Sequence, residues 1–245
     1  MAAAHWEFHP GVAATVAVLI AAPLLAALGF WQLDRAAQKE DRHRTFVARG
    51  KQEPVDLNIA TPWRADPLAL ELRRVRVRGQ FLPVTFLLDN QVYRTKAGYD
   101  VYTPLRIEGD EAIVLVDRGW IAVGPDRARA PDITTPGDTL DLDGLARLTS
   151  EPPLVLRDTS PEQLAPGLVR VQRIELPVLA AEHRWQLLPY ELRLDPRAPA
   201  GYTRDWPVPG AGSERHGGYA LQWFAMSGVV LLLYVYSNLR WKKAE

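Results

Sequence analysis

The chain has 245 residues, enough for one or two globular domains with a hydrophobic core. Lysine and arginine together number 29, as do aspartate and glutamate, and this charge balance argues against a dedicated nucleic-acid-binding protein. The chain has no cysteine, which excludes disulfides, thiolate metal sites and cysteine nucleophiles.

Two long uncharged runs flank a polar segment. Residues 11–33 and 217–239 carry no charged side chain, and each exceeds the roughly 20 helical residues that a bilayer core requires. The first run is alternatively a cleaved signal peptide, but its length and the lack of Lys or Arg before it favour a retained helix. The predicted organisation is an N-terminal segment at 1–10, a membrane helix at 11–33, a domain at 34–215, a second membrane helix at 216–239 and a tail at 240–245.

The charges that flank the two runs give opposing indications of orientation. The tail carries Arg240, Lys242 and Lys243, which is typical of a cytoplasmic end. The basic stretch "DRAAQKEDRHR" after the first run indicates the reverse. We give the short tail more weight, because long domains are translocated with little regard to their charge.

The middle segment is expected to be mainly β. In residues 73–82, Val75 and Val77 alternate with arginines, the period of a half-buried strand. The expected fold class is an α+β membrane protein, with two transmembrane helices bracketing a mainly antiparallel-β extracytoplasmic domain, either a sheet or a small barrel. Further strands are expected at 85–93, with a turn at Asp89-Asn90, and at 98–107, 111–123, 137–148 and 167–176; a short helix is expected at 175–185, and loops at 129–137 and 195–215.

Motifs for catalysis are scarce. The sequence contains no HExxH, GxSxG, P-loop or GxGxxG pattern. His5 and His9 have the i, i+4 spacing of one helical face, which fits either a metal site or a plain lead-in to the first helix. Asp117 and Arg118 follow a buried strand, where a structural ion pair is favoured over a catalytic one.

An aromatic residue and two cations follow one another at the exit of the first helix. Trp31, Arg35 and Lys39 recur at i, i+4 and i+8 and would form a stripe on a continuous helix. The stripe is either an interface anchor, with Trp at headgroup level and the cations near phosphates, or a docking surface for a partner.

The second membrane helix begins beside a histidine. At about 100° per residue, His216 and Trp223 fall nearly in line, Ala220 and Ser227 flank that line, and Tyr219 lies at its edge. His216 is either an interfacial histidine that bonds headgroups or a loop carbonyl, or an axial ligand of haem beside aromatic walls. A matching stripe of small residues is expected on the first helix at Ala13, Ala17 and Ala21.

Several of these stretches together resemble the Surfeit-locus-one family of cytochrome c oxidase assembly proteins. The matching stretches occur in the family's order and span the chain from end to end. They are "FHPG", "LGFWQLDRAAQKE", "GYDVYTPL", "VLVDRGWIA" and "RHGGYALQWFAMS".

The resemblance implies a non-catalytic assembly factor in a bacterial inner membrane, with both termini cytoplasmic and the central domain periplasmic. Members assist insertion of haem a into the large catalytic subunit of the oxidase. By analogy His216 would bind the haem iron, and Tyr219 and Trp223 would line the pocket. This chain has Gly217-Gly218 where a larger apolar residue is often found, and each glycine weakens a helical turn by roughly 1 kcal/mol relative to alanine.

The expected mechanism is a transient holder that takes haem a from a synthase and passes it to the oxidase catalytic subunit. Its expected partners are therefore that subunit, the haem a synthase and membrane lipid, with Trp31, Arg35 and Lys39 serving docking as well as anchoring. Three alternatives remain: a scaffold without cofactor, a membrane sensor and a membrane-anchored periplasmic enzyme. The sensor is disfavoured, because only residues 240–245 follow the second helix.

Overall fold

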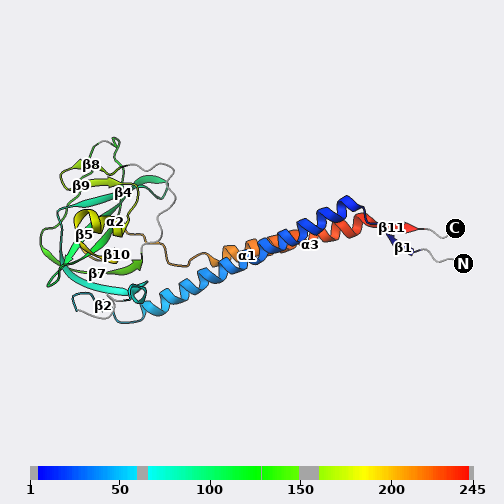
Figure 1. The fold of residues 1–245 in the computed structure, drawn as a ribbon, viewed down its shortest axis with the longest axis horizontal. Helices are drawn as coiled ribbons and strands as arrows, with labels where there is room; N and C mark the ends of the chain where they lie inside the picture. Colours follow the sequence, from blue (N-terminus) through cyan, green and yellow to red (C-terminus); the bar gives the residue numbers. More distant parts are fainter. Residues whose placement is uncertain (1–4, 60–65, 128, 149–159, 243–245) are drawn as a thin grey trace. The chain divides into compact units, whose positions relative to one another are not determined.

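The computed structural model describes residues 5–59, 66–127, 129–148 and 160–242. The chain divides into two compact units. One comprises the residues up to Thr45 together with those from Pro207 onward, and the other comprises Phe46–Trp206. The first unit is helical and the second is built on β-strands (Figure 1).

Two long helices dominate the first unit. Helix α1 spans Val12–Gly50 and helix α3 spans Ser213–Asn238. Both are long enough and apolar enough to cross a membrane. Helix α1 continues past Leu33, where its uncharged run ends, because residues 34–49 contain no glycine or proline to interrupt it.

A two-stranded ribbon forms from the chain segments that precede α1 and follow α3. Strand β1 (His5–Phe8) pairs antiparallel with strand β11 (Leu239–Lys242). The helix expected at His5 and His9 is wrong, because β1 is extended and α1 begins only at Val12. The His9 ring lies 2.9 Å from the Glu7 carboxylate.

Five strands of the second unit close into a small barrel. They run in the order β3-β7-β10-β6-β5, and β5 also pairs with β3. A Cβ on Gly79 of β3 would lie 2.2 Å from the backbone oxygen of Arg106, so the closing strands come together only because residue 79 has no side chain. The strands are β3 (Arg74–Phe81), β5 (Lys96–Ile107), β6 (Ala112–Ala122), β7 (Thr139–Leu148) and β10 (Gln186–Leu194).

Alternating side chains fill this barrel. In β3 every second residue is buried, which is the pattern predicted from Val75 and Val77. All barrel neighbours are antiparallel except β6 and β10, which are parallel. The buried core includes Val75, Val77, Leu105, Ile107, Val114, Val116, Leu142, Leu192 and Leu194.

Further elements extend the sheet beyond the barrel. Strand β4 pairs with β5, and β9 and β8 follow outward, while β2 pairs with β3 at the other edge. Helix α2 covers Phe86 and Leu115 with its own Leu176 and Leu179. These elements are β2 (Val55–Asp56), the 3-10 helix η2 (Pro67–Leu70), β4 (Thr85–Tyr93), β8 (Glu162–Ala165), β9 (Leu168–Val171) and α2 (Leu176–His183).

The predicted fold class is confirmed, with the small barrel as the form that the β-domain takes. The turn expected at Asp89-Asn90 is wrong. Both residues lie within β4, where a bulge between Leu88 and Gln91 accommodates the positive φ of 61° at Asn90. The chain reverses instead at Arg94-Thr95, with φ of 45° and 70°.

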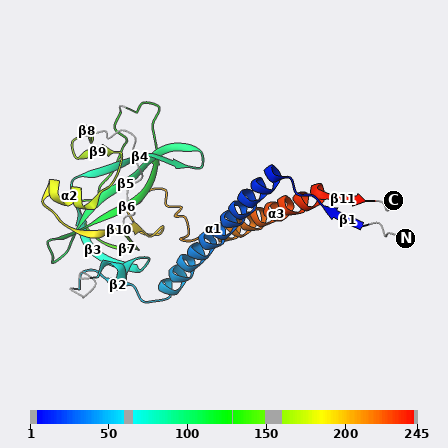
Figure 2. The same cartoon turned by 45° about the vertical axis from the view of Figure 1, so that its right-hand side comes forward.

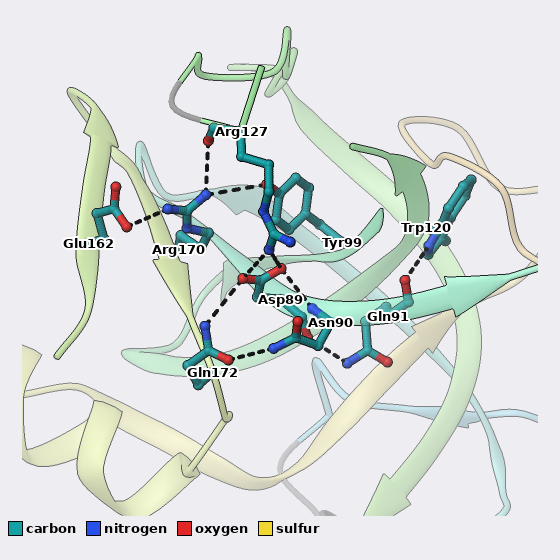
Figure 3. A network of polar contacts seen from close by, with 9 residues as sticks. All are labelled: Asp89, Asn90, Gln91, Tyr99, Trp120, Arg127, Glu162, Arg170 and Gln172. Atoms are coloured by element: carbon teal, nitrogen blue, oxygen red, sulfur yellow. Dashed lines mark hydrogen bonds and ion pairs between the residues drawn. The ribbon is translucent and has the colours of Figure 1, made fainter. Parts of the chain in front are cut away.

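The bulge directs Asp89 into a polar network (Figure 3). Both oxygens of its buried carboxylate accept from Nη2 of Arg127, at 2.6 and 2.7 Å. Gln172 of the segment after β9 donates to the same carboxylate at 3.2 Å, and its own Oε1 accepts from Asn90. The network ties the β4–β5 pair to β9 and to the loop that carries Arg127.

Candidate functional site

Helices α1 and α3 lie side by side and antiparallel, as both Figure 1 and Figure 2 show. Ser227 of α3 donates from its hydroxyl to the backbone oxygen of Ala22 at 2.9 Å. Toward the ribbon, the hydroxyls of Thr15 and Tyr234 lie 2.7 Å apart. These contacts fix the register of the pair.

A glycine allows a close approach between these helices. A Cβ on Gly29 would lie 2.6 Å from the Phe224 ring, which also makes an edge-to-face contact with Phe30 at 5.1 Å between centroids. The predicted stripe of Ala13, Ala17 and Ala21 is therefore not the contact face, since Ala13 and Ala17 are exposed and only Ala21 is half-buried. The contact face repeats at spacings of three and four residues, at Thr15, Val18, Ala22, Leu25, Gly29, Gln32, Ala36, Lys39 and His43, all buried or half-buried.

His216 lies on this seam at the polar end of the apolar runs. Its Nδ1 is 2.7 Å from Oε1 of Gln32, the last polar position on α1 before the charged residues begin. Helix α3 starts at Ser213, so His216 and the two glycines that follow it all lie within the helix. The Ser213 hydroxyl donates to Glu40 at 3.3 Å, which holds the start of α3 against α1.

The two predicted aromatic neighbours of His216 lie on the same side of α3. Trp223 is half-buried and seven residues from His216, which is close to two helical turns. Tyr219 lies at the edge of that face and is 50% exposed. Ala220 and Ser227, which were predicted to flank the line, are buried against α1.

The predicted stripe of Trp31, Arg35 and Lys39 divides between two faces of α1. The Arg35 guanidinium lies 5.8 Å from the centroid of the half-exposed Trp31 ring, a cation–π arrangement. Arg35 also donates to Gln38 at 3.0 Å. Lys39 is half-buried on the α3-facing side, and its backbone oxygen abuts Gly210.

Comparison with known proteins places this chain in a family. The model of the SURF1 family matches residues 19–228, which is most of the chain. The chain belongs to the SURF1 family. It is 26% identical to a SURF1-like protein of Monosiga brevicollis over 238 residues, which cover 89% of this chain and 85% of the relative.

Two other relatives match shorter stretches. A SURF1-like protein of Rickettsia bellii is 33% identical over 118 residues, covering 43% of this chain and 42% of its own. Surfeit locus protein 1 of Arabidopsis thaliana is 35% identical over 104 residues, covering 38% and 29%. The SURF1 family is known in general as a family of cytochrome c oxidase assembly factors, which is the family that the sequence motifs indicated.

The motif "VDRGW" has a structural role in the β-domain. Asp117 and Arg118 are adjacent in β6 and point to opposite faces, so the ion pair expected between them does not form. Arg118 is only 1% exposed and donates to the backbone oxygens of Ala200 and Thr134, at 2.7 and 2.6 Å. It thereby pins the loop that contains Thr134, and burial lowers the pKa of its guanidinium.

Asp117 belongs to a separate charged cluster on the other face. Arg193 lies 3.8 Å from Asp117 and 3.9 Å from Glu191, and Arg147 donates to Glu191 at 3.2 Å. Burial raises the pKa of Asp117 well above its usual value, and the nearby carboxylates of Glu191 and Asp100 add to the effect. Burial raises the pKa of Asp100 to about 6.

This cluster has the properties of a structural network. Three carboxylates face two guanidiniums, so full ionisation would leave excess negative charge in a buried place. In the part of the chain that the structure describes, no group of three or more His, Asp or Glu side chains is placed to hold a metal ion.

Gln32 was not singled out from the sequence. Its partner lies 184 residues away, and only the register of the two helices brings them together. The sequence offered one indication. Gln32 is the single amide in the run 11–33 and lies near the end of that run, just as His216 lies just before the second run.

Proposed function

We propose that this SURF1-family protein assists cytochrome c oxidase assembly by carrying haem a transiently, with His216 as the axial ligand. Haem a is the cargo in this proposal. It comes from a haem a synthase and is delivered to the large catalytic subunit of the oxidase. The protein itself is not a catalyst.

The observation that carries the proposal is the contact between Nδ1 of His216 and Gln32. A histidine whose Nδ1 bonds a protein acceptor presents Nε2 as a ligand, and ligating histidines commonly have such a partner. The half-exposed ring of Tyr219 and the half-buried ring of Trp223 supply apolar surface beside it. The residues present therefore fit a haem held by one axial nitrogen.

The two apolar helices support the proposed location of the protein in a membrane. They cross the bacterial inner membrane, the tail with Arg240 is cytoplasmic, and the central domain faces the periplasm. His216 then lies at the periplasmic boundary of the lipid. The Trp31–Arg35 pair, exposed at the same boundary, is available to lipid headgroups and to the oxidase subunit.

The experiment that tests this function removes the gene and measures haem in the oxidases of isolated membranes. We expect oxidase catalytic subunit with less haem a per polypeptide, restored by the wild-type gene. Unchanged haem a content and oxidase activity would overturn the assembly role. Restoration by a His216→Ala gene as complete as by wild type would favour the scaffold that binds the subunit without cofactor.

A further inference from the structure

The Gln32–His216 contact has a consequence for the state of the imidazole. We propose that Gln32 is a positioning residue that holds His216 as the Nδ1-protonated tautomer, with the Nε2 lone pair free to bind iron. The proposal deepens the proposed haem-carrying function and rests on it, because the ligand that His216 would bind is the haem iron.

The chemistry follows from the two atoms in contact. The amide oxygen of Gln32 is an acceptor without a proton, and it lies 2.7 Å from Nδ1 of His216. A hydrogen bond between these atoms requires the proton to reside on Nδ1. In a neutral imidazole the other nitrogen then has its lone pair exposed, which is the form that a metal ion needs.

The surrounding contacts restrict Gln32 to this position. Gly29, one turn earlier on the same face of α1, abuts Phe224, and Glu40, two turns later, receives the hydrogen bond from Ser213. The amide is thus bracketed by helix–helix contacts on both sides. Both partners are half-buried on the seam, where competition from water is reduced.

The hydrogen bond also bears on the electronic character of the ligand. An acceptor at Nδ1 makes the imidazole a more basic ligand, and outer-shell hydrogen bonds of this kind tune the potential of haem iron. The contact also orients the ring of a histidine that has two glycines directly after it. Gln32 therefore compensates for the weak helical turn around His216.

The test compares full-length proteins purified from cells that make haem a. Gln32→Leu removes the acceptor, and we expect haem occupancy to fall by about tenfold or more. Gln32→Glu keeps an acceptor that cannot donate when ionised, so it should restore occupancy and shift the reduction potential of the bound haem to a more negative value. Gln222→Leu, the same substitution at an exposed position of α3, is the matched control and should behave as wild type.

A second measurement needs no haem. Nitrogen-15 chemical shifts of the imidazoles in the haem-free protein report the tautomer, and the His216 signals are identified by their loss in His216→Ala. We expect protonation at Nδ1 in wild type and Gln32→Glu. In Gln32→Leu the proton should move to Nε2, the form that unrestrained histidine prefers.

The two measurements separate the possible failures. If the wild-type protein never acquires haem, the proposed function is wrong. The tautomer of His216 in the haem-free protein still tests the role of Gln32. A wild-type protein that binds haem, with Gln32→Leu matching it in occupancy, potential and tautomer, defeats the positioning role alone. The opposite hydrogen bond, with Gln32 donating to Nδ1, would also overturn the inference. It would be shown if haem binding were lost in Gln32→Glu and if His216 of the wild-type protein were protonated at Nε2.

Discussion

The hydroxyl of Ser227 on α3 donates a hydrogen bond of 2.9 Å to the backbone oxygen of Ala22 on α1, and these two residues are 205 positions apart in the chain. This bond lies between the Gln32–His216 contact on one side and the Thr15–Tyr234 contact on the other. The proposed site at His216 depends on that register.

The register can be tested by crosslinking, because the natural chain has no cysteine. The double variant Ala22→Cys, Ser227→Cys should form an intramolecular disulfide on mild oxidation of membranes, detected by a reductant-sensitive mobility shift. Ala22→Cys combined with Val229→Cys should not, since Val229 is exposed on the far side of α3. Equal crosslinking of both pairs would contradict the packing.

Gly29 offers a second test of the helix pair. Gly29→Leu should lower the thermal unfolding temperature of the detergent-solubilised protein, because its side chain would occupy the space of the Phe224 ring. Adding Phe224→Ala should recover part of the loss. Gly228→Leu is the control, since a Cβ at Gly228 meets nothing within 4 Å. Equal shifts for the two glycine variants would argue against close packing at Gly29.

Arg118 should prove important for the stability of the β-domain. Arg118→Leu removes the donor to the carbonyl of Ala200 and leaves the carbonyl of Thr134 only the longer bond from Tyr202, so we expect a loss on the order of 3 kcal/mol in unfolding free energy. Arg76→Leu, which removes an exposed ion pair with Asp143, should cost less than about 1 kcal/mol. Denaturant unfolding followed by circular dichroism measures both. A loss no larger than that of Arg76→Leu would refute the structural role of Arg118.

The raised pKa of Asp100 predicts that the free energy of unfolding depends on pH. Its pKa is raised by burial to about 6 in the folded protein, so the folded state holds a proton that the unfolded state has already released between about pH 4 and pH 6. Stability from this group is therefore present at low pH and is lost as the pH rises through about 6. Asp117 and Glu191, whose pKa values are also raised, contribute in the same direction.

Asp100→Asn should therefore raise the unfolding free energy at pH 7, by on the order of 2 kcal/mol, and flatten its decline between pH 4 and pH 6. Unfolding curves at a series of pH values measure this difference. A variant that is no more stable at pH 7, with an unchanged slope, would contradict a raised pKa at Asp100.

Alternating apolar residues and one continuous apolar run made several barrel strands predictable. Val75 and Val77 marked β3, and the run from Ile113 to Val116 marked β6. Strand β10 was missed, although Leu188, Tyr190, Leu192 and Leu194 alternate in it, because Pro189 and the charged residues between them resemble a loop. Those charges are buried only because the neighbouring strands contribute the opposite charges, which a single strand's sequence does not reveal.

The helix contact face was not predictable in the same way. Residues 12–33 of α1 are uncharged and mainly apolar on every side, so periodicity does not distinguish the face toward α3 from the face toward lipid. Small residues are frequent around the helix, and those at Ala13 and Ala17 are exposed. His216 could be proposed because a family motif contains it, whereas Gln32 required the register of the pair.

The central claim, that His216 is the axial ligand of a transiently held haem, is tested most directly by one absorption spectrum. Wild type, His216→Ala and His43→Ala are purified at full length from cells making haem a. His43 is the matched control, a half-buried histidine on α1 whose ring contacts the backbone oxygen of Pro209. We predict a haem band in wild type and His43→Ala that is lost in His216→Ala; no band in wild type, or a full band in His216→Ala, would contradict the account.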